Sequence, residues 1–155
     1  MKLIVISGAK YSKKNLLAFR LSNKPNCVWI KPYTNKRDPV NAEPHDNYIP
    51  LNDNQLMEKM DREVALASTI LDGYLFVFFE NQLKDDYSII VGDDKIVHNT
   101  KSNWGGDIVT VKCHSSIEEP SSRFLFKDSE FDIVFNYEND DYDALEELIF
   151  RGETL

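Results

Sequence analysis

The chain has 155 residues, of which 42% are hydrophobic and 28% charged, and its formal net charge at pH 7 is −8. This composition is typical of a globular protein, and we predict one domain over residues 1–155. The acidic charge argues against sequence-independent nucleic-acid binding, which depends on Lys and Arg to neutralise phosphates. The longest apolar run, Tyr74–Phe79, is far shorter than the roughly 20 residues of a membrane span. With only two cysteines and no disulfide framework, a cytoplasmic protein is expected.

The first thirty residues predict a strand, a helix and a second strand. Leu3–Ser7 is a short apolar run that ends at Gly8, as in a buried parallel strand that enters a turn. Asn15–Leu21 places apolar residues at helical spacing, and Cys27–Ile30 is again apolar. Strand, helix and strand form a βαβ unit, so we predict an α/β fold with a mostly parallel central sheet.

The rest of the chain predicts further strands and helices around an irregular connector. Lys31–Pro50 contains four prolines and is expected to be irregular. Asn52–Met60 begins with cap residues and continues as a helix, and a polar, helical stretch that includes Trp104-Gly-Gly106 is expected between the strands at Tyr87–Val91 and Asp107–Lys112. Strands are predicted at Leu75–Phe79, Tyr87–Val91, Asp107–Lys112 and Phe131–Phe135, and a last helix at Ala144–Phe150.

The turn after the first strand is similar to a phosphate-binding loop, G-x-x-x-x-G-K-[ST]. Gly8 and Lys14 fit this pattern, whereas Lys13 stands at the second glycine and Asn15 at the metal-binding hydroxyl. In such loops backbone N–H groups hold phosphate oxygens, and glycines allow the close approach. Because Tyr11 and Lys13 bring side chains into this loop, a structural turn and a phosphate site both remain open.

Three segments together resemble guanylate kinase, a P-loop nucleoside monophosphate kinase that transfers the γ-phosphoryl group of ATP to GMP. They are VISGAKYSKKN, KPYTNKRDPVNAEPHDNY and FDIVFNYENDDYDALEELI. The resemblance covers most of the chain. It implies a three-layer P-loop kinase-like fold, with a small β-rich acceptor-binding subdomain at about residues 35–83. The arginine-rich lid of the family is reduced here to residues 115–130.

The resemblance also implies an acceptor-phosphate site that has changed. Thr34 and Tyr48 match residues of the family, and Lys36 stands at an arginine, which keeps the charge but loses the bidentate fork. A phosphate-binding tyrosine becomes Phe76, and the guanine-reading glutamate falls near Ala67, so guanine preference should be lost. The acceptor-phosphate residues implied are Thr34, Lys36, Arg37 and Tyr48.

The catalytic groups implied by the resemblance are Lys14 and Asp93. The family has two acids in D-x-D, and here the segment is Val91-Gly92-Asp93. Asp93 with Asp94 could ligate Mg²⁺, but a turn is the simpler interpretation. Arg123 is the single arginine of the reduced lid, so the transferring phosphoryl group lacks compensating cations and fast transfer is not expected. The three histidines do not have zinc-ligand spacing, and no metal site is predicted.

An aromatic run, Tyr74-Leu-Phe-Val-Phe-Phe79, stands where the family has a polar, substrate-facing segment. Alternate residues of a strand face opposite sides, so one buried face does not account for the whole run. The run is either buried on both faces, or fills the acceptor pocket, or forms a partner surface. For the last case the surface residues predicted are Tyr74, Phe76, Phe78 and Phe79.

The sequence therefore predicts a catalytically impaired, guanylate-kinase-like pseudoenzyme that acts as a protein-binding or inhibitory module. Residual phosphate-ligand binding would use Lys14, Lys36 and Tyr48. The alternative is an active nucleoside monophosphate kinase that uses ATP and Mg²⁺, with Asp93 near the metal. The compact, Lys/Asn/Asp-rich chain suggests a bacteriophage protein in a host cytoplasm, with a protein partner whose identity the sequence does not give.

Overall fold

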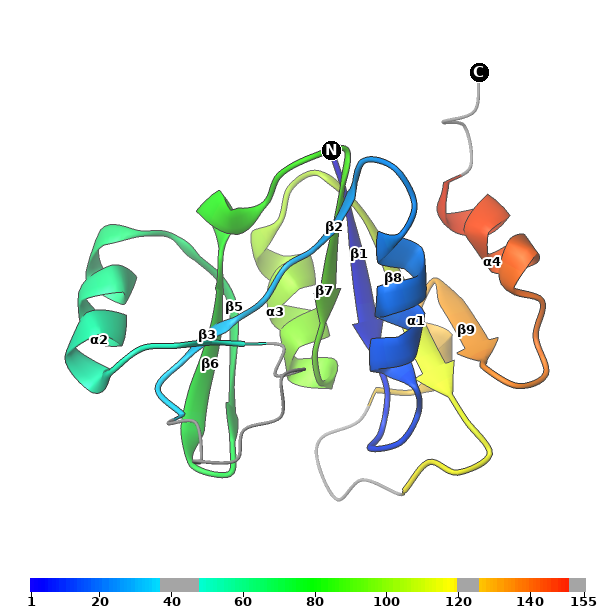
Figure 1. Ribbon diagram of the computed structural model, residues 1–155, viewed down its shortest axis with the longest axis horizontal. Coiled ribbons are helices and arrows are strands. Elements are labelled where there is room, and N and C mark those ends of the chain that lie inside the picture. The colour runs from blue at the N-terminus through cyan, green and yellow to red at the C-terminus, as the bar shows by residue number, and fades with distance from the viewer. Residues whose placement is uncertain (37–47, 120–125, 151–155) are drawn as a thin grey trace.

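The computed structural model of the chain describes residues 1–36, 48–119 and 126–150. These residues form two β-sheets and four α-helices, in the order given in Figure 1. Within these ranges no helix is long and apolar enough to cross a membrane.

The central sheet has five strands, and all of its pairings are parallel. The strands are β1 (Lys2–Ser7), β2 (Cys27–Trp29), β7 (Tyr87–Val91), β8 (Asp107–His114) and β9 (Ile133–Asn136), in the spatial order β2-β7-β1-β8-β9. Strand β1 lies in the middle, and its four residues from Leu3 to Ile6 are completely buried. Helices cover both faces of such a sheet, which explains why its strands are continuous apolar runs. The predicted parallel α/β sheet is confirmed.

Helices α1 (Lys14–Ser22) and α4 (Tyr142–Ile149) cover one face of this sheet, and α3 (Asp94–Asn103) covers the other. Leu17 and Leu21 of α1 join Leu145 and Ile149 of α4 in one hydrophobic core. Ile96 and Val97 of α3 belong to a second core, on the opposite side of β1. Because successive β1 side chains alternate between these cores, the sheet is the middle layer of three.

The second sheet has the spatial order β4-β3-β6-β5. It contains β3 (Tyr33–Thr34), β4 (Ile49–Pro50), β5 (Ala65–Leu71) and β6 (Tyr74–Phe79); β3 and β4 pair in parallel, and the other pairs are antiparallel. Helix α2 (Asp53–Arg62) begins at Asn52, whose side chain forms a capping box with Gln55. The sequence analysis predicted α2 and β6 but not β5, because the apolar and polar residues of Ala65–Leu71 do not alternate strictly and the segment is not a continuous apolar run. The short strands β3 and β4 lie in the segment expected to be irregular.

Strand β6 is buried on both faces near its C-terminal end, so the predicted partner surface is wrong for two of its residues. Phe78 is 2% exposed and packs in the core beneath α3, whereas Phe79 is completely buried against Leu56 of α2. The two rings point to opposite sides because they are adjacent in a strand. Only Tyr74, which is 38% exposed, and the half-buried Phe76 remain near the surface.

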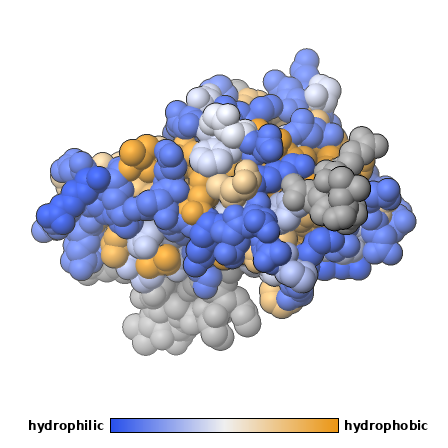
Figure 2. Space-filling view, turned by 90° about the horizontal axis from the view of Figure 1, so that it is seen from above, coloured by the Kyte–Doolittle hydropathy of each residue, from blue (hydrophilic) through white to orange (hydrophobic). Residues whose placement is uncertain are grey.

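The exposed hydrophobic side chains of the described residues come from several elements. Leu16 and Phe19 lie on α1, Met57 on α2, Ile70 on β5 and Leu148 on α4. On the face shown in Figure 2, hydrophilic residues cover most of the surface, and hydrophobic residues form separate patches. Scattered apolar residues of this kind are ordinary on globular proteins.

Candidate phosphate-binding site

The loop between β1 and α1 has two non-glycine residues with a left-handed backbone, and one of them, Lys13, stands at the second glycine of the phosphate-binding pattern. Tyr11 has φ 63° and Lys13 has φ 69°. A non-glycine residue in this conformation costs about 1–2 kcal/mol. Gly8 is needed for another reason, because a Cβ there would lie 2.2 Å from Ser12 Oγ and 2.7 Å from the Cys113 carbonyl oxygen. Lys13 therefore has the conformation that favours glycine, at the position where the pattern has its second glycine.

Contacts with neighbouring segments stabilise the strained loop. Lys13 Nζ lies 2.7 Å from Glu138 Oε1, and the Ser115 hydroxyl donates to the same carboxylate at 2.6 Å. The Lys13 and Ser115 hydrogen bonds lower the pKa of Glu138 to about 2, so this carboxylate stays charged. On the other side the Cys113 thiol donates to the Ser12 carbonyl oxygen at 3.1 Å. Lys13 is thus held by Glu138, and the sequence analysis did not foresee this partner.

Tyr11 does not fill the loop. Its side chain is 53% exposed, and its ring lies 5.1 Å from Lys10 Nζ. A tyrosine packed into the phosphate position would have excluded a nucleotide, and a residue as exposed as Tyr11 is not packed there.

Helix α1 begins in this loop without a side-chain cap, whereas the other three α-helices are capped. Asn52, Asp93 and Asp141 accept backbone N–H groups at the starts of α2, α3 and α4, but Lys13 forms no such bond. The first N–H groups of a helix have no acceptor within the helix and carry its partial positive charge. The N-terminus of α1 is therefore suited to an anion.

Lys14 is the first residue of α1 and is largely buried beside this N-terminus. Its ammonium donates to the Ala9 carbonyl oxygen at 3.3 Å. Burial lowers the pKa of Lys14, with Lys112 acting in the same direction and Asp93 in the opposite one. A phosphate would compensate this poorly solvated charge, so loop and lysine together form a candidate phosphate-binding site.

Asp93 and Asp94, the two carboxylates that follow strand β7, form hydrogen bonds and an ion pair within the fold. Asp93, which follows β7, accepts the N–H of Ile96 at 3.0 Å and the hydroxyl of Thr69 at 2.7 Å. Asp94 is 1% exposed, and its carboxylate oxygens lie 3.0 and 3.1 Å from Lys112 Nζ. Ser7 at the end of β1 donates to Asp94 as well, at 2.6 Å. The ion pair of Lys112 with Asp94 was not predicted, although a lysine within the apolar strand β8 is a signal for it.

These residues do not fit a magnesium ion. A magnesium site needs oxygen ligands that are free to coordinate, whereas Asp94 is neutralised by Lys112 and Asp93 caps α3. No group of three or more His, Cys, Asp or Glu side chains that could hold a metal occurs among the described residues. Asn15, at the position of the metal-binding hydroxyl, is an exposed residue of α1.

Three of the acceptor-side residues lie together on the second sheet. Lys36 Nζ is 5.6 Å from the centre of the Tyr48 ring, which meets the Phe76 ring edge to face at 6.1 Å. Thr34 is completely buried, and its hydroxyl accepts the N–H of Lys36 at 3.1 Å. The loop after β1 and the end of β3 both lie toward the lower side of Figure 1. Arg37 lies outside the described residues.

The segment expected to be a reduced lid joins β8 to β9. Of its described parts, 115–119 and 126–130, only the 3-10 helix η2 (Asp128–Glu130) is helical. Arg123 lies outside the described residues.

His114, the last residue of β8, holds the two described parts of this segment. Its Nδ1 lies 2.8 Å from Glu118, and its Nε2 lies 3.1 Å from Asp128. Burial by itself would lower the pKa of His114, but the hydrogen bonds to Glu118 and Asp128 outweigh burial and raise it. Protonated His114 therefore stabilises the folded state.

We expect the free energy of unfolding to fall as the pH rises from about 6 to about 8. A raised folded-state pKa gives a stabilisation that is complete below the unfolded value of 6.5 and is lost above the folded value. The pair is partly solvent-exposed, so the effect should be below about 1 kcal/mol. Urea unfolding at the two pH values, compared with His114→Gln, measures it. An identical pH dependence in the variant would contradict the assignment.

Comparison with known proteins shows that this chain is similar to solved structures in its fold. No family model matches the chain, and no curated protein matches its sequence. Among solved structures, a guanylate kinase from Anaplasma phagocytophilum is similar with a TM-score of 0.64 and 14% sequence identity. The similarity covers 95% of this chain and 81% of that chain. The arrangement of sheets and helices in this protein is therefore a guanylate-kinase-like α/β fold.

Proposed function

We propose that the chain is a catalytically impaired guanylate-kinase-like protein that acts by binding. It holds a phosphate-bearing ligand in the loop after β1 and a protein partner elsewhere on its surface. The observation that carries the phosphate site is the uncapped N-terminus of α1, with Lys14 beside it and a loop backbone that keeps its left-handed residues. Helix N–H groups and a lysine ammonium bind phosphate oxygens without a metal.

The impairment is supported by the groups around this site. Asp93 and Asp94 are engaged in the fold, and Lys112 places a second buried ammonium near Lys14. Lys14 and the helix N-terminus attract an anion, whereas the charge of Lys112 is already paired with Asp94. Among the described residues, Asp93 and Asp94 are both engaged in the fold and leave no ligand set for Mg²⁺. Phosphoryl transfer depends on cations placed to neutralise the developing charge. We therefore propose that the protein binds a phosphate-bearing ligand but does not transfer a phosphoryl group.

An active nucleoside monophosphate kinase is the second candidate. It is supported by the exposed side chain of Tyr11, which is not packed into the phosphate position, and by the cluster of Lys36, Tyr48 and Phe76 on the acceptor side. Ala67, near which the guanine-reading glutamate of the family falls, is 3% exposed within β5. Such a kinase would have no guanine preference, because the buried alanine offers no acceptor to the base.

The partner-binding half of the proposal concerns an inhibitory role in a bacterial cytoplasm, for a protein of bacteriophage origin. The compact, Lys/Asn/Asp-rich sequence supports this role. It is independent of the phosphate site and is tested separately.

We expect ATP, GMP or dGMP to raise the melting temperature of the wild-type chain by several degrees without Mg²⁺. A ligand at 100 times its dissociation constant stabilises by about 2.7 kcal/mol, and each kcal/mol raises the melting temperature of a chain of this size by about 2–4 °C. Lys14→Ala should lose this shift, and Lys101→Ala, an exposed lysine of α3, should keep it.

Assays of phosphoryl transfer from ATP to GMP and dGMP complete the test. The proposal expects no product above the background. If no nucleotide shifts the melting temperature, the phosphate site is contradicted. If the wild-type chain transfers phosphoryl groups in the presence of Mg²⁺ and Lys14→Ala does not, the protein is a kinase instead.

A further inference from the structure

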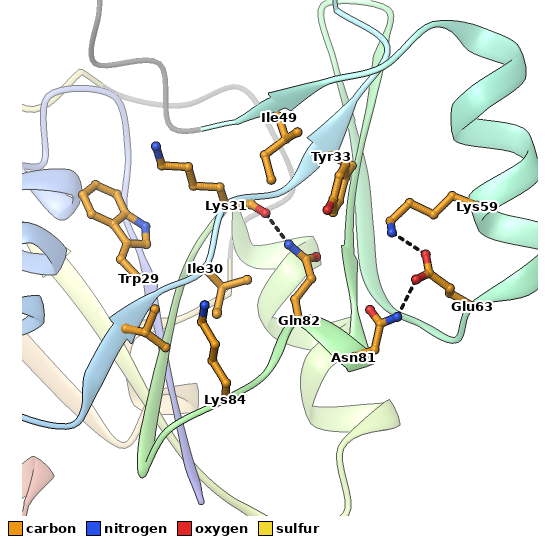
Figure 3. A pocket seen from close by; sticks show the side chains of 11 residues that line it. Trp29, Ile30, Lys31, Tyr33, Ile49, Lys59, Glu63, Asn81, Gln82 and Lys84 are labelled. Atoms are coloured by element: carbon orange, nitrogen blue, oxygen red, sulfur yellow. Dashed lines mark hydrogen bonds and ion pairs between the residues drawn. The ribbon is translucent and has the colours of Figure 1, made fainter.

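A second candidate binding site lies between the central sheet and helix α2, away from the phosphate loop. It is a cavity of about 510 Å³, bordered by residues 28–31, by Lys59 of α2 and Glu63 just after it, and by Lys84 before β7 (Figure 3). None of the residues 8–14 of the phosphate loop lines it. Its volume is within the range of about 300–1,000 Å³ that is common for ligand pockets.

The cavity runs along the outer edge of β2. Strand β2 is the first in the spatial order of the central sheet and pairs only with β7 among the described strands. Side chains of a strand alternate between its faces, so a cavity lined by both Val28 and Trp29 of β2, and by the two residues that follow, lies against the edge. The N–H of Ile30 points inward and donates to the Ile89 carbonyl oxygen at 2.8 Å. The N–H of Trp29 therefore points toward the outer edge, where a further strand can pair.

The end of this edge is closed by Gln82. Its amide donates to the carbonyl oxygen of Lys31 at 2.7 Å and accepts the N–H of Phe79 at 2.8 Å. The side chain is thus fixed by two hydrogen bonds. It limits an incoming strand to the part of β2 that precedes Lys31.

The cavity is positively charged on an acidic protein. Lys59 Nζ lies 2.5 Å from Glu63, which also accepts a hydrogen bond from Asn81, so this pair is neutral. Lys31 and Lys84 are exposed and form no ion pair within the described part of the chain. The lining therefore carries two uncompensated positive charges on a chain whose net charge is −8. Acidic ligands are repelled by the rest of the surface and attracted here.

We propose that this cavity binds a short, extended acidic segment of a partner protein. The segment adds as a strand along β2, and its carboxylates approach Lys31 and Lys84. This inference rests on the partner-binding half of the proposed function, since it names the chemistry of the partner, and it does not depend on phosphate binding at the loop.

The two tryptophans of the chain provide a direct assay. Trp29 lines the cavity, whereas Trp104 lies after α3, so Trp104→Phe leaves Trp29 as the only tryptophan. A short blocked peptide of alternating Glu and Val should change the Trp29 fluorescence in a saturable way. The matching peptide of Lys and Val should not.

Charge reversal tests the two lysines. In the Trp104→Phe background, Lys31→Glu with Lys84→Glu should weaken binding of the Glu-Val peptide by about tenfold or more. Lys101→Glu reverses an exposed lysine of α3 and should leave the affinity unchanged. Circular dichroism spectra that match the parent show that these variants are folded.

Three results would overturn the inference. The first is that the Glu-Val peptide does not change the Trp29 fluorescence in a saturable way. The second is that the double variant binds this peptide as tightly as the parent does. The third is that inorganic phosphate changes the fluorescence as much as the peptide does, which would indicate a small-anion site. The absence of a saturable effect is the result expected if Lys31 and Lys84 only prevent other strands from pairing with the edge of β2. Lys14→Ala separates the two proposals, because it should lose the nucleotide shift and keep peptide binding.

Discussion

Lys112→Met should destabilise the folded protein by about 3–5 kcal/mol, because it leaves a charged carboxylate buried without its partner. Lys112 is 4% exposed and Asp94 is 1% exposed, so water reaches neither group. Their ion pair joins β8 to the first turn of α3, next to the end of β1. Urea unfolding, followed by tryptophan fluorescence, gives the change in the free energy of unfolding.

Two further variants separate the ion pair from a general loss of packing. Lys95→Met replaces the exposed lysine next to Asp94 and should change stability by less than about 0.5 kcal/mol. Asp94→Leu combined with Lys112→Met removes both charges and should recover much of the loss, because replacing a whole buried pair by apolar residues is often neutral. A Lys112→Met protein as stable as the parent would contradict the buried pair.

Phe79→Ala should destabilise the protein by about 3–5 kcal/mol, the usual loss for a buried aromatic residue. Phe79 is completely buried, and its ring meets the Tyr33 ring edge to face at 5.7 Å. Tyr74→Ala, on the same strand but 38% exposed, should cost less than about 1 kcal/mol. Urea unfolding of both variants measures the difference, and equal, small losses would restore a surface role for Phe79.

Local sequence was sufficient for much of the fold. The apolar run Leu3–Ser7, the helical spacing after Lys14 and the next apolar run predicted a βαβ unit, and β1, α1 and β2 form it. Parallel strands buried on both faces are recognisable because nearly every residue in them is apolar. Strand β5 was missed because Ala65–Leu71 shows neither strict alternation nor a continuous apolar run, and its pairing with β6 and its packing against α3, where Leu66 and Ile96 share one core, are tertiary contacts.

The chain itself determined the phosphate-loop spacing of Gly8 and Lys14 and the acidic character of the whole protein. Only the tertiary structure decided what Lys13, Asp94 and Phe79 do. Lys13 pairs with Glu138, 125 residues away, Asp94 pairs with Lys112, 18 residues away, and Phe79 packs on α2. Burial and ion pairing depend on which segments meet in space, and the spacing of residues along one chain does not contain that information.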